Sequence, residues 1–181
     1  MRGHVLEMDD VHTRSKTHIG TVVVPAAWGM AQYVGASGKE FLTAVVAGYE
    51  TMAWIGIALG VTSHRQKGWH VTGTAGTFGA AAACSKLLKL DADQTLSALG
   101  MSGTQTCGLW AFLEDRATSK VLHPARAAVS GAEAALLAEA GMTGPAHILE
   151  ARDGGMLAAM TDAQDIQAVS RELGSRYEIL Y

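Results

Sequence analysis

The chain has 181 residues, of which 49% are hydrophobic and 17% charged, a balance typical of one globular domain and not of a disordered chain. A formal net charge of -3 and the lack of a Lys/Arg cluster argue against nucleic acid as a partner. No uncharged apolar stretch is long enough to span a bilayer, because Glu50 interrupts the longest one, residues 41–62. We therefore expect no membrane partner.

The first forty residues predict a polar start followed by two helices. Residues 1–20 are irregular, and a helix is predicted over residues 21–34, with Pro25 in its opening turn, where proline is tolerated. Ser37 and Glu40 have the spacing of a capping box, which opens a long second helix.

This second helix is predicted to reach about residue 59, where Gly60 can close it, and residues 61–69 are predicted as a polar loop. A third helix is predicted over residues 74–88. Its glycines and alanines leave a thin surface that lets neighbouring helices pack closely, so we expect it at the centre of the fold.

Start and stop signals continue to the end of the chain. Asp91 is a candidate N-cap, and Gly141 is a good residue to follow a helix. No run of alternating β-branched residues indicates a sheet, so the predicted fold class is an all-α helix bundle. The remaining helices are predicted over residues 95–101, 121–140, 145–150 and 162–173.

The segment around His70 has the features of a reaction site. This histidine follows Gly68 and Trp69 at a loop-to-helix junction rich in small residues, which let a ligand approach closely. The N-terminus of the next helix favours an anion, so a carboxylate substrate is indicated. Two other segments carry further polar groups: Glu7, Asp9, Asp10, His12 and His18 near the start, and Ser119, Lys120 and His123 near the middle.

Four blocks of sequence lie, in order, within residues 4–27, 37–50, 68–88 and 98–150. Together they resemble the helical domain of the MmgE/PrpD family, which includes 2-methylcitrate dehydratases, cis-aconitate decarboxylases and iminodisuccinate epimerases. The resemblance implies that residues 1–181 form a single, partial helical domain. It also implies that the family's first helices and its α/β lid domain, which contributes active-site groups, are absent.

The resemblance also implies roles for individual residues. The family's reactions work on a carbon next to a carboxylate, which requires a base and a group that stabilises negative charge. His70 matches the family's acid/base histidine, and Lys120 the lysine that binds a substrate carboxylate. His18 and Glu7 complete the expected catalytic set. The expected substrate-binding residues are His123, Asp10 and His12.

Structural roles are the alternatives for these residues. His70 can instead cap a helix or be a buried, hydrogen-bonded histidine, His123 can be hydrogen-bonded to the backbone, and Lys120 can be solvated. The acids, Asp9 above all, can be helix caps or solvated groups. The His/Asp spacings match no zinc pattern, so we expect neither a metal nor a cofactor.

Several remaining aromatic, histidine and cysteine side chains are assigned structural positions. His64 and His147 are interpreted as surface residues, and the isolated Cys84 and Cys107 as buried thiols of a reducing compartment, which predicts a cytoplasmic protein. The tryptophans are interpreted as core or pocket wall: Trp28, Trp54, Trp69 and Trp110.

The resulting functional hypothesis is a lyase for a small di- or tricarboxylate, with dehydration of 2-methylcitrate in propionate catabolism as the type reaction. Val11 stands where some decarboxylases of the family have threonine, which weighs against decarboxylation. Decarboxylation of cis-aconitate and epimerisation of iminodisuccinate are the alternatives within the family. A non-catalytic partial chain, or a helical subunit that needs a lid or partner, is the alternative of another class. The resemblance also implies a homodimer formed through the helical domain.

Overall fold

The computed structural model describes residues 2–181. Of the predicted irregular segment, residues 1–20, only residue 1 lies outside the described residues. Between residues 2 and 181 the secondary structure is helical and no strand is present, which confirms the all-α prediction. The α-helices are α1 (Gly20–Val34), α2 (Gly38–Ala58), α3 (Val61–Gln66), α4 (Val71–Leu88), α5 (Ala92–Thr104), α6 (Leu122–Glu139), α7 (Met156–Met160) and α8 (Ala168–Arg171). Short 3-10 turns are η1 (Arg2–His4), η2 (Trp110–Leu113), η3 (Thr118–Val121) and η4 (Glu178–Leu180).

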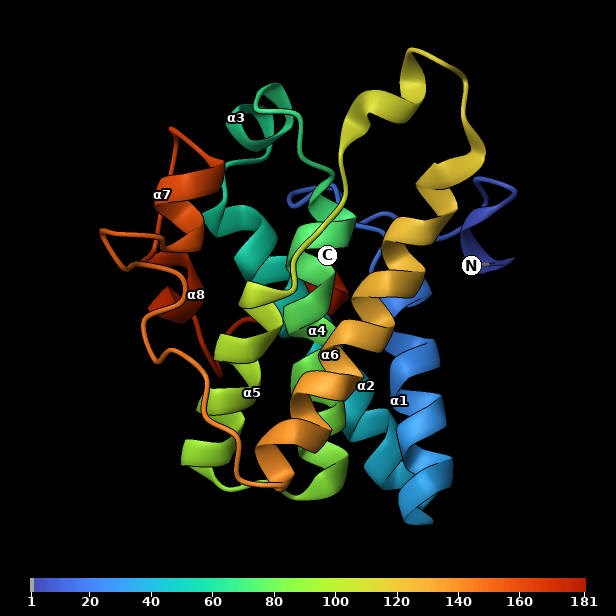
Figure 1. The fold of residues 1–181 in the computed structure, drawn as a ribbon. Coiled ribbons are helices and arrows are strands. Elements are labelled where there is room, and N and C mark those ends of the chain that lie inside the picture. The colour runs from blue at the N-terminus through green and yellow to red at the C-terminus, as the bar shows by residue number, and fades with distance from the viewer. Residues whose placement is uncertain (1) are drawn as a thin grey trace.

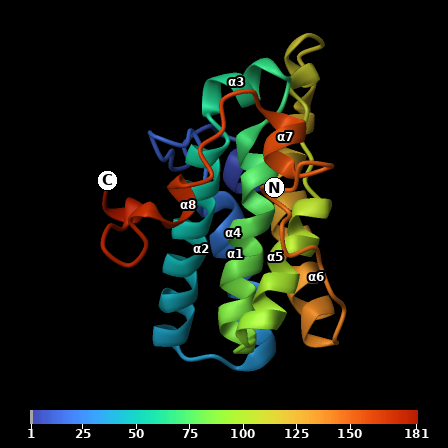
Figure 2. The ribbon, with the colours of Figure 1, turned by 90° about the vertical axis from the view of Figure 1, so that its left-hand side faces the viewer.

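Helix α4 is the central element of the bundle, as predicted. It packs against α1, α2, α5 and α6 (Figures 1 and 2). Nearly all of its side chains are buried. The close approach depends on glycines at the crossings. A Cβ on Gly79 would lie 2.7 Å from the Cβ of Met52 on α2, and one on Gly131 of α6 would lie 2.5 Å from the Cβ of Ala80. Small residues therefore decide how near the surrounding helices come.

Three helices begin at the same end of the bundle. The colour order in Figure 1 shows that α1, α4 and α6 run from the upper end downward, whereas α2 and α5 run upward. The N-termini of α1, α4 and α6, near Gly20, Val71 and Leu122, thus lie at this upper end. Free N–H groups and helix dipoles make such an end electropositive.

The predicted helix signals act as expected at most boundaries. Ser37 and Glu40 form a complete capping box at the start of α2. Gly141 follows α6 with a φ of 91°, in the left-handed region that glycine adopts without steric cost. Helix α1 starts at Gly20, so Pro25 lies in its second turn and not in its first.

Asp91 and Gln94 form a second capping box, and helix α5 begins directly after Asp91, three residues earlier than predicted. Helix α4 also begins three residues earlier than predicted, directly after His70. The predicted helices over residues 21–34 and 121–140 are confirmed to within one residue at each end.

Three local predictions are wrong. Residues 61–66 form helix α3 and not a loop, whereas residues 146–150 form turns and not a helix. In the predicted helix 162–173, only α8 is α-helical. Tertiary hydrogen bonds explain the last two cases. The carbonyl of Ile148 accepts from the N–H of Met156, and the N–H of Asp165 donates to the carbonyl of Ala58 at the end of α2.

The predicted positions of single side chains are also partly confirmed and partly wrong. Trp54 and Cys84 are buried and His147 is exposed, as predicted, and Cys107 is half-buried. Trp28 is 56% exposed and lines a pocket beside Asp9 and Gly20, so its assignment to a pocket wall is confirmed and its assignment to the core is wrong. Helical periodicity alone did not show that this part of α1 faces outward.

Helix α2 is the one described helix that is long and apolar enough to cross a membrane, with a mean hydropathy of 1.4 over its most apolar window. The helix packs against α1 and α4 in this fold. Glu50, the carboxylate in the middle of the helix, accepts hydrogen bonds from the N–H groups of Glu178 and Ile179 in the C-terminal segment. The apolar surface of α2 is therefore used in packing against the other helices of the bundle.

His64 corrects another prediction, because it is fully buried and not on the surface. Its Nδ1 lies 3.1 Å from the carbonyl oxygen of Met160, and its Nε2 lies 2.8 Å from the hydroxyl of Thr74. A ring held between these two groups fits the neutral imidazole. Burial lowers the pKa of His64 to about 4, and the hydrogen bond to Met160 opposes this only in part.

The packing at Gly131 predicts that Gly131→Ala lowers the free energy of unfolding by about 1–3 kcal/mol, although alanine is the better helix former. The added methyl group has to fit against Ala80 and the backbone nitrogen of Ala81, which lies 2.6 Å from its position. Urea denaturation measures the change. Gly29→Ala is the control, because none of the described atoms lies within 4 Å of the added Cβ. Equal stability of the two variants would contradict the packing argument.

A second prediction concerns acid stability. The unfolded chain protonates His64 below about pH 6.5, whereas the folded protein resists protonation until about pH 4. The contribution of His64 to stability is therefore present at neutral pH and falls as the pH drops, by about 2 kcal/mol between pH 7.5 and 5. His64→Gln removes this part of the pH dependence in urea denaturation. His147→Gln, at an exposed position, should leave the wild-type slope unchanged.

Candidate active site

Four segments meet at the end of the bundle where α1, α4 and α6 begin. The N–H of His70 donates to the carbonyl of Gly108 over 2.9 Å, and the N–H of Trp110 donates to the carbonyl of Gly68 over 2.9 Å. These bonds tie the start of α4 to the loop before η2. The N–H of His18 donates to the hydroxyl of Thr72 over 3.1 Å, which ties the N-terminal segment to α4 as well.

His70 occupies the N-cap position of α4, with φ -97° and ψ 104°. Its side chain makes no capping hydrogen bond to the described residues and turns into a cluster of rings. Its Nδ1 lies 2.9 Å from Nδ1 of His123, so one of the two nitrogens carries the proton and the other accepts it. Trp110 and Phe112 wall the pair, with ring centroids 5.0 and 6.4 Å from that of His70.

Two glycines make room for this histidine pair. A Cβ on Gly108, whose φ is 116°, would lie 3.2 Å from Nδ1 of His123. A Cβ on Gly73 would run into the carbonyl oxygen of Cys107. Glycine at both positions therefore lets the chain pass closely behind the rings.

Both histidines of the pair are neutral at neutral pH. The pKa of His70 is lowered to about 3, first by burial and then by the charges of His123, His4, Lys120 and His18. The pKa of His123 is also lowered, first by burial and then by His4 and Lys120. The two imidazoles are therefore poised to accept protons once negative charge enters the site.

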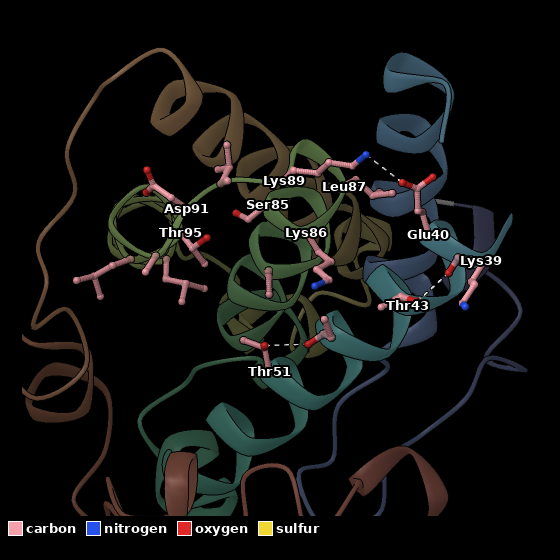
Figure 3. A pocket seen from close by; sticks show the side chains of 16 residues that line it. Lys39, Glu40, Thr43, Thr51, Ser85, Lys86, Leu87, Lys89, Asp91 and Thr95 are labelled. Carbon is pink, nitrogen blue, oxygen red and sulfur yellow. Dashed lines mark hydrogen bonds and ion pairs between the residues drawn. The ribbon is translucent and has the colours of Figure 1, made fainter. Parts of the chain in front are cut away.

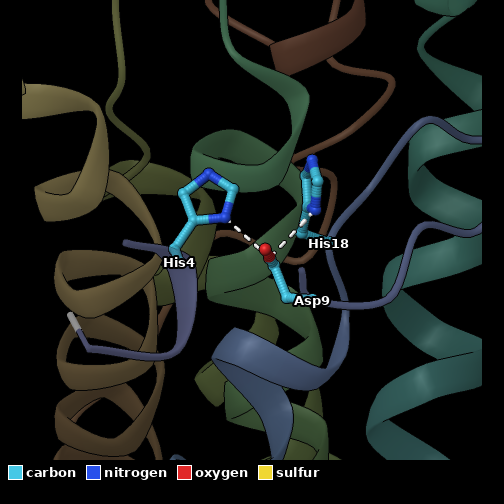
Figure 4. A group of neighbouring side chains, drawn as sticks. All are labelled: His4, Asp9 and His18. Atoms are coloured by element: carbon cyan, nitrogen blue, oxygen red, sulfur yellow. Dashed lines mark hydrogen bonds and ion pairs between the residues drawn. The ribbon is translucent and has the colours of Figure 1, made fainter. Parts of the chain in front are cut away.

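A second group of rings surrounds Asp9. The Oδ2 atom of Asp9 accepts a hydrogen bond from Nδ1 of His4 over 2.6 Å and lies 3.0 Å from Nδ1 of His18 (Figure 4). The ring centroid of His4 is 4.5 Å from that of His18 and 6.1 Å from that of His70. His4 thus connects the Asp9 group to the His70 pair.

Lys120 supplies a fixed positive charge. Its Nζ lies 2.6 Å from both carboxylate oxygens of Glu7. Lys120 is mostly buried, whereas Glu7 is 56% exposed and has a φ of 52°, in a region that non-glycine residues rarely adopt. The hydrogen bond from Lys120 holds the pKa of Glu7 below its ordinary value. A rare backbone conformation at a charged residue is typical of functional sites.

Comparison with known proteins assigns the chain to a family. Residues 1–168 match the model of the MmgE/PrpD N-terminal domain. The chain belongs to the MmgE/PrpD family. Its helical fold is that of the family's all-α N-terminal domain.

Three relatives of the chain are named as cis-aconitate decarboxylases or as similar to them. The chain is 36% identical over 163 residues to a cis-aconitate decarboxylase-like protein of Aspergillus oryzae, covering 86% of the chain and 34% of that protein. It is 31% identical over 160 residues to the cis-aconitate decarboxylase of Aspergillus terreus, covering 86% of the chain and 32% of the relative. The human cis-aconitate decarboxylase is 30% identical over 156 residues, covering 83% of the chain and 32% of the relative. The chain thus spans about a third of the length of these relatives.

The structure of this MmgE/PrpD domain brings five of the predicted site residues to one place. His70, His123 and His18 lie within reach of the charge of Lys120, and Glu7 pairs with Lys120. Two of the nearest side chains, His4 and Asp9, were not among the predicted catalytic or substrate-binding residues. The spacing of His4 and Asp9 in a loop has no period, so the sequence carried no signal that their side chains meet.

Asp10 lies beside this cluster in a structural position. Both of its carboxylate oxygens lie 3.0 Å from the N–H of Gly20 at the start of α1, and its Oδ2 accepts a hydrogen bond from the hydroxyl of Tyr49 over 2.8 Å. These contacts are those of the helix cap that was the alternative for the acids. A role of Asp10 in substrate binding stays a prediction.

His12 also lies outside the cluster, in a second group of charges. Its Nε2 is 3.0 Å from Oε2 of Glu178, a fully buried carboxylate that also pairs with Arg14 and Arg176. The group fixes the C-terminal segment against the loop before α1. Substrate binding by His12 likewise stays a prediction.

The His4, Asp9 and His18 group has the residue types of a metal site, with ligand atoms within 4.8 Å of one another. Two observations speak for another role. The short bond between His4 and Asp9 already uses the nitrogen and oxygen that would face an ion. Lys120 and three helix N-termini also make this end of the bundle electropositive, which favours anions over cations. We therefore do not assign these residues as metal ligands.

The largest groove lies elsewhere, at the opposite end of α4. It has a volume of about 990 Å³ between α2, α4 and α5, and Lys39, Lys86 and Lys89 are among the side chains that line it (Figure 3). Lys89 is paired with Glu40 over 3.1 Å. Because no histidine lines this groove, we assign the acid/base chemistry to the opposite end of the bundle.

Proposed function

We propose that this domain supplies the acid/base and carboxylate-binding groups of a lyase that acts on a small di- or tricarboxylate. The observation that carries the proposal is the Lys120–Glu7 pair beside the imidazoles of His70, His123 and His18. A fixed cation and several proton carriers at one site are the groups that chemistry next to a carboxylate requires.

The carboxylate of Glu7 marks where a substrate carboxylate would bind. Glu7 is more than half exposed and contacts Nζ of Lys120 with both oxygens, so a substrate carboxylate can replace it on the same cation. The N-termini of α1, α4 and α6 add to the attraction for an anion. A second substrate carboxylate would then face the imidazoles.

Proton transfer is assigned to His70 and His18. The pKa of about 3 makes His70 a weak base in the empty site, but a bound polyanion favours the imidazolium and raises its basicity. His70 then takes a proton from the carbon next to a carboxylate. Lys120 stabilises the negative charge that develops on that carboxylate, and His18 supplies the returning proton.

The same groups serve the reactions known in the family. In decarboxylation a carbon–carbon bond breaks, carbon dioxide leaves, and the electron pair left on carbon takes a proton from an acid. In dehydration a base removes a proton from carbon and an acid protonates the leaving hydroxyl. The names of the relatives favour cis-aconitate as the first substrate to test, and 2-methylcitrate, the type substrate of the sequence analysis, is the second.

A second candidate function is a helical subunit that completes its site with a lid or partner. The exposure of Glu7 favours it, because a site that excludes water would cover this residue. Exposed large apolar side chains on α1 and α6 offer a surface for a second copy of the chain, so the expected homodimer belongs to this proposal. They include Val24, Trp28, Tyr33, Val129 and Leu136.

Proton NMR in D2O tests the proposed activity. The purified chain is incubated with cis-aconitate, 2-methylcitrate, citrate and iminodisuccinate. We expect turnover or incorporation of solvent deuterium, reduced about 100-fold or more by His70→Ala and by Lys120→Ala, since each removes a group used in proton transfer or charge stabilisation.

Lys86→Ala, in the distant groove, is the matched control and should retain the wild-type rate. A folded chain that shows no exchange with any substrate would reject activity of the domain alone and favour the second candidate. Equal rates for all three variants would remove Lys120 and His70 from the proposed machinery.

Binding of a tricarboxylate is predicted to take up protons. The pKa values of His70, His123 and His18 are all lowered in the empty site, first by burial and then by neighbouring charges. A bound anion raises them, so affinity increases as the pH falls from 8 to 6, by at most about tenfold per pH unit for each proton taken up.

Isothermal titration calorimetry in buffers of different ionisation enthalpy counts these protons, with citrate as the probe. His70→Gln should reduce the uptake, whereas His147→Gln, at an exposed position, should not change it. Proton release on binding, or affinity that falls towards pH 6, would contradict the prediction.

A further inference from the structure

Asp9 is the buried carboxylate at the centre of the ring cluster. Its side chain is 6% exposed and that of His4 is fully buried. A single oxygen, Oδ2, contacts Nδ1 of both His4 and His18, at 2.6 and 3.0 Å (Figure 4). The other oxygen, Oδ1, is buried without a hydrogen-bond partner among residues 2–181.

This arrangement is not explained by solvation or by a helix cap. A buried carboxylate with one unpaired oxygen lowers the stability of the fold, so its presence calls for another explanation. The neighbouring Asp10 carries out the capping of α1, with both oxygens at the N–H of Gly20. Asp9 therefore has a role that its neighbour does not have.

The contacts of Asp9 determine where its two histidines carry protons. An ionised carboxylate only accepts hydrogen bonds, so Nδ1 of His4 must be protonated. Nδ1 of His18 lies 3.0 Å from the same oxygen without hydrogen-bond geometry, and because a lone pair there would be repelled by the carboxylate, this nitrogen also carries a proton. In both rings Nε2 lies on the side away from Asp9, as Figure 4 shows.

We propose that Asp9 is a positioning residue that holds the rings of His4 and His18 in place and favours protonation of His18, so that Nε2 of His18 can donate a proton once an anionic substrate is bound. The inference rests on the proposed function, in which His18 is the acid. The ring of His4 contacts that of His18 and lies near that of His70, so His4 separates the two histidines.

The charges around His18 explain why it needs a counter-charge. Burial disfavours its imidazolium form and is the largest influence on its pKa, which is lowered overall. His4 and Lys120 also oppose protonation, and His18 and His70 repel each other when both are charged. Asp9 is the main group that opposes these effects, and Glu7, already paired with Lys120, adds less.

The proton that His18 donates in this step is replaced from solvent. His18 gives the proton on Nε2 to the carbanion or to the leaving hydroxyl and becomes neutral, with its remaining proton on Nδ1 facing Asp9. Asp9 stays ionised, because burial raises its pKa less than the hydrogen bond from His4 and the neighbouring charges lower it. Solvent restores the proton on Nε2, since the side chain of His18 is partly exposed.

The test titrates the histidines of the substrate-free chain by NMR. Long-range proton–nitrogen correlation spectra report which ring nitrogen carries the proton. In the wild type we expect protonated Nδ1 in both His4 and His18 at neutral pH. An Nε2-protonated neutral tautomer in either ring would overturn the proposal without any variant.

Asp9→Asn should lower the pKa of His18 by about one unit or more, because it removes a negative charge in direct contact with the ring. Where the variant catalyses the reaction, the acidic shift appears in its pH–rate profile as well. Asp10→Asn is the matched control. It removes a negative charge at the adjacent position, while its amide oxygen can still accept from the N–H of Gly20, so it should leave the His18 titration unchanged.

A His18 pKa that is unchanged in a folded Asp9→Asn variant would overturn the proposal, as would an equal shift in Asp10→Asn. These readings need no substrate turnover. A chain that shows the expected titration but no activity would therefore reject the proposed function and leave the positioning role of Asp9 intact.

Discussion

The close packing around helix α4 is the constraint on which the rest of the structure depends. Glycine and alanine on α4 and on the faces opposite let α2 and α6 approach until backbone and Cβ atoms touch. This geometry places the first turns of α1, α4 and α6 together at one end (Figure 1). A larger side chain at a crossing would separate those ends and with them the segments that carry the histidines.

The shared end of the three helices then sets the electrostatics of the site. Helix N-termini and Lys120 make it positive, and the buried imidazoles respond by staying neutral, with pKa values below their ordinary range. Two carboxylates balance this field in different ways. Glu7 lies at the exposed rim on Lys120, where a substrate carboxylate can replace it, whereas Asp9 is buried between two rings. One anion is thus exchangeable and the other is fixed.

Neighbouring residues in the N-terminal segment have separate tasks because a loop can turn successive side chains in different directions. Asp9 faces His4 and His18, while Asp10 caps α1. His18 joins the cluster, but His12 pairs with Glu178 from the far end of the chain. Such divisions among adjacent residues of one type depend on long-range contacts.

The sequence by itself determined the all-α class, the main helices and the central place of the glycine- and alanine-rich helix, because periodicity, capping boxes and residue size are local properties. It also indicated His70, Lys120, His18, Glu7 and His123 through their resemblance to a family. Only the tertiary structure decided that Asp9 and His4, and not Asp10 and His12, join them, and that His64 is buried. Burial, shared protons and pKa values depend on groups far apart in the chain, which no local pattern of residues encodes.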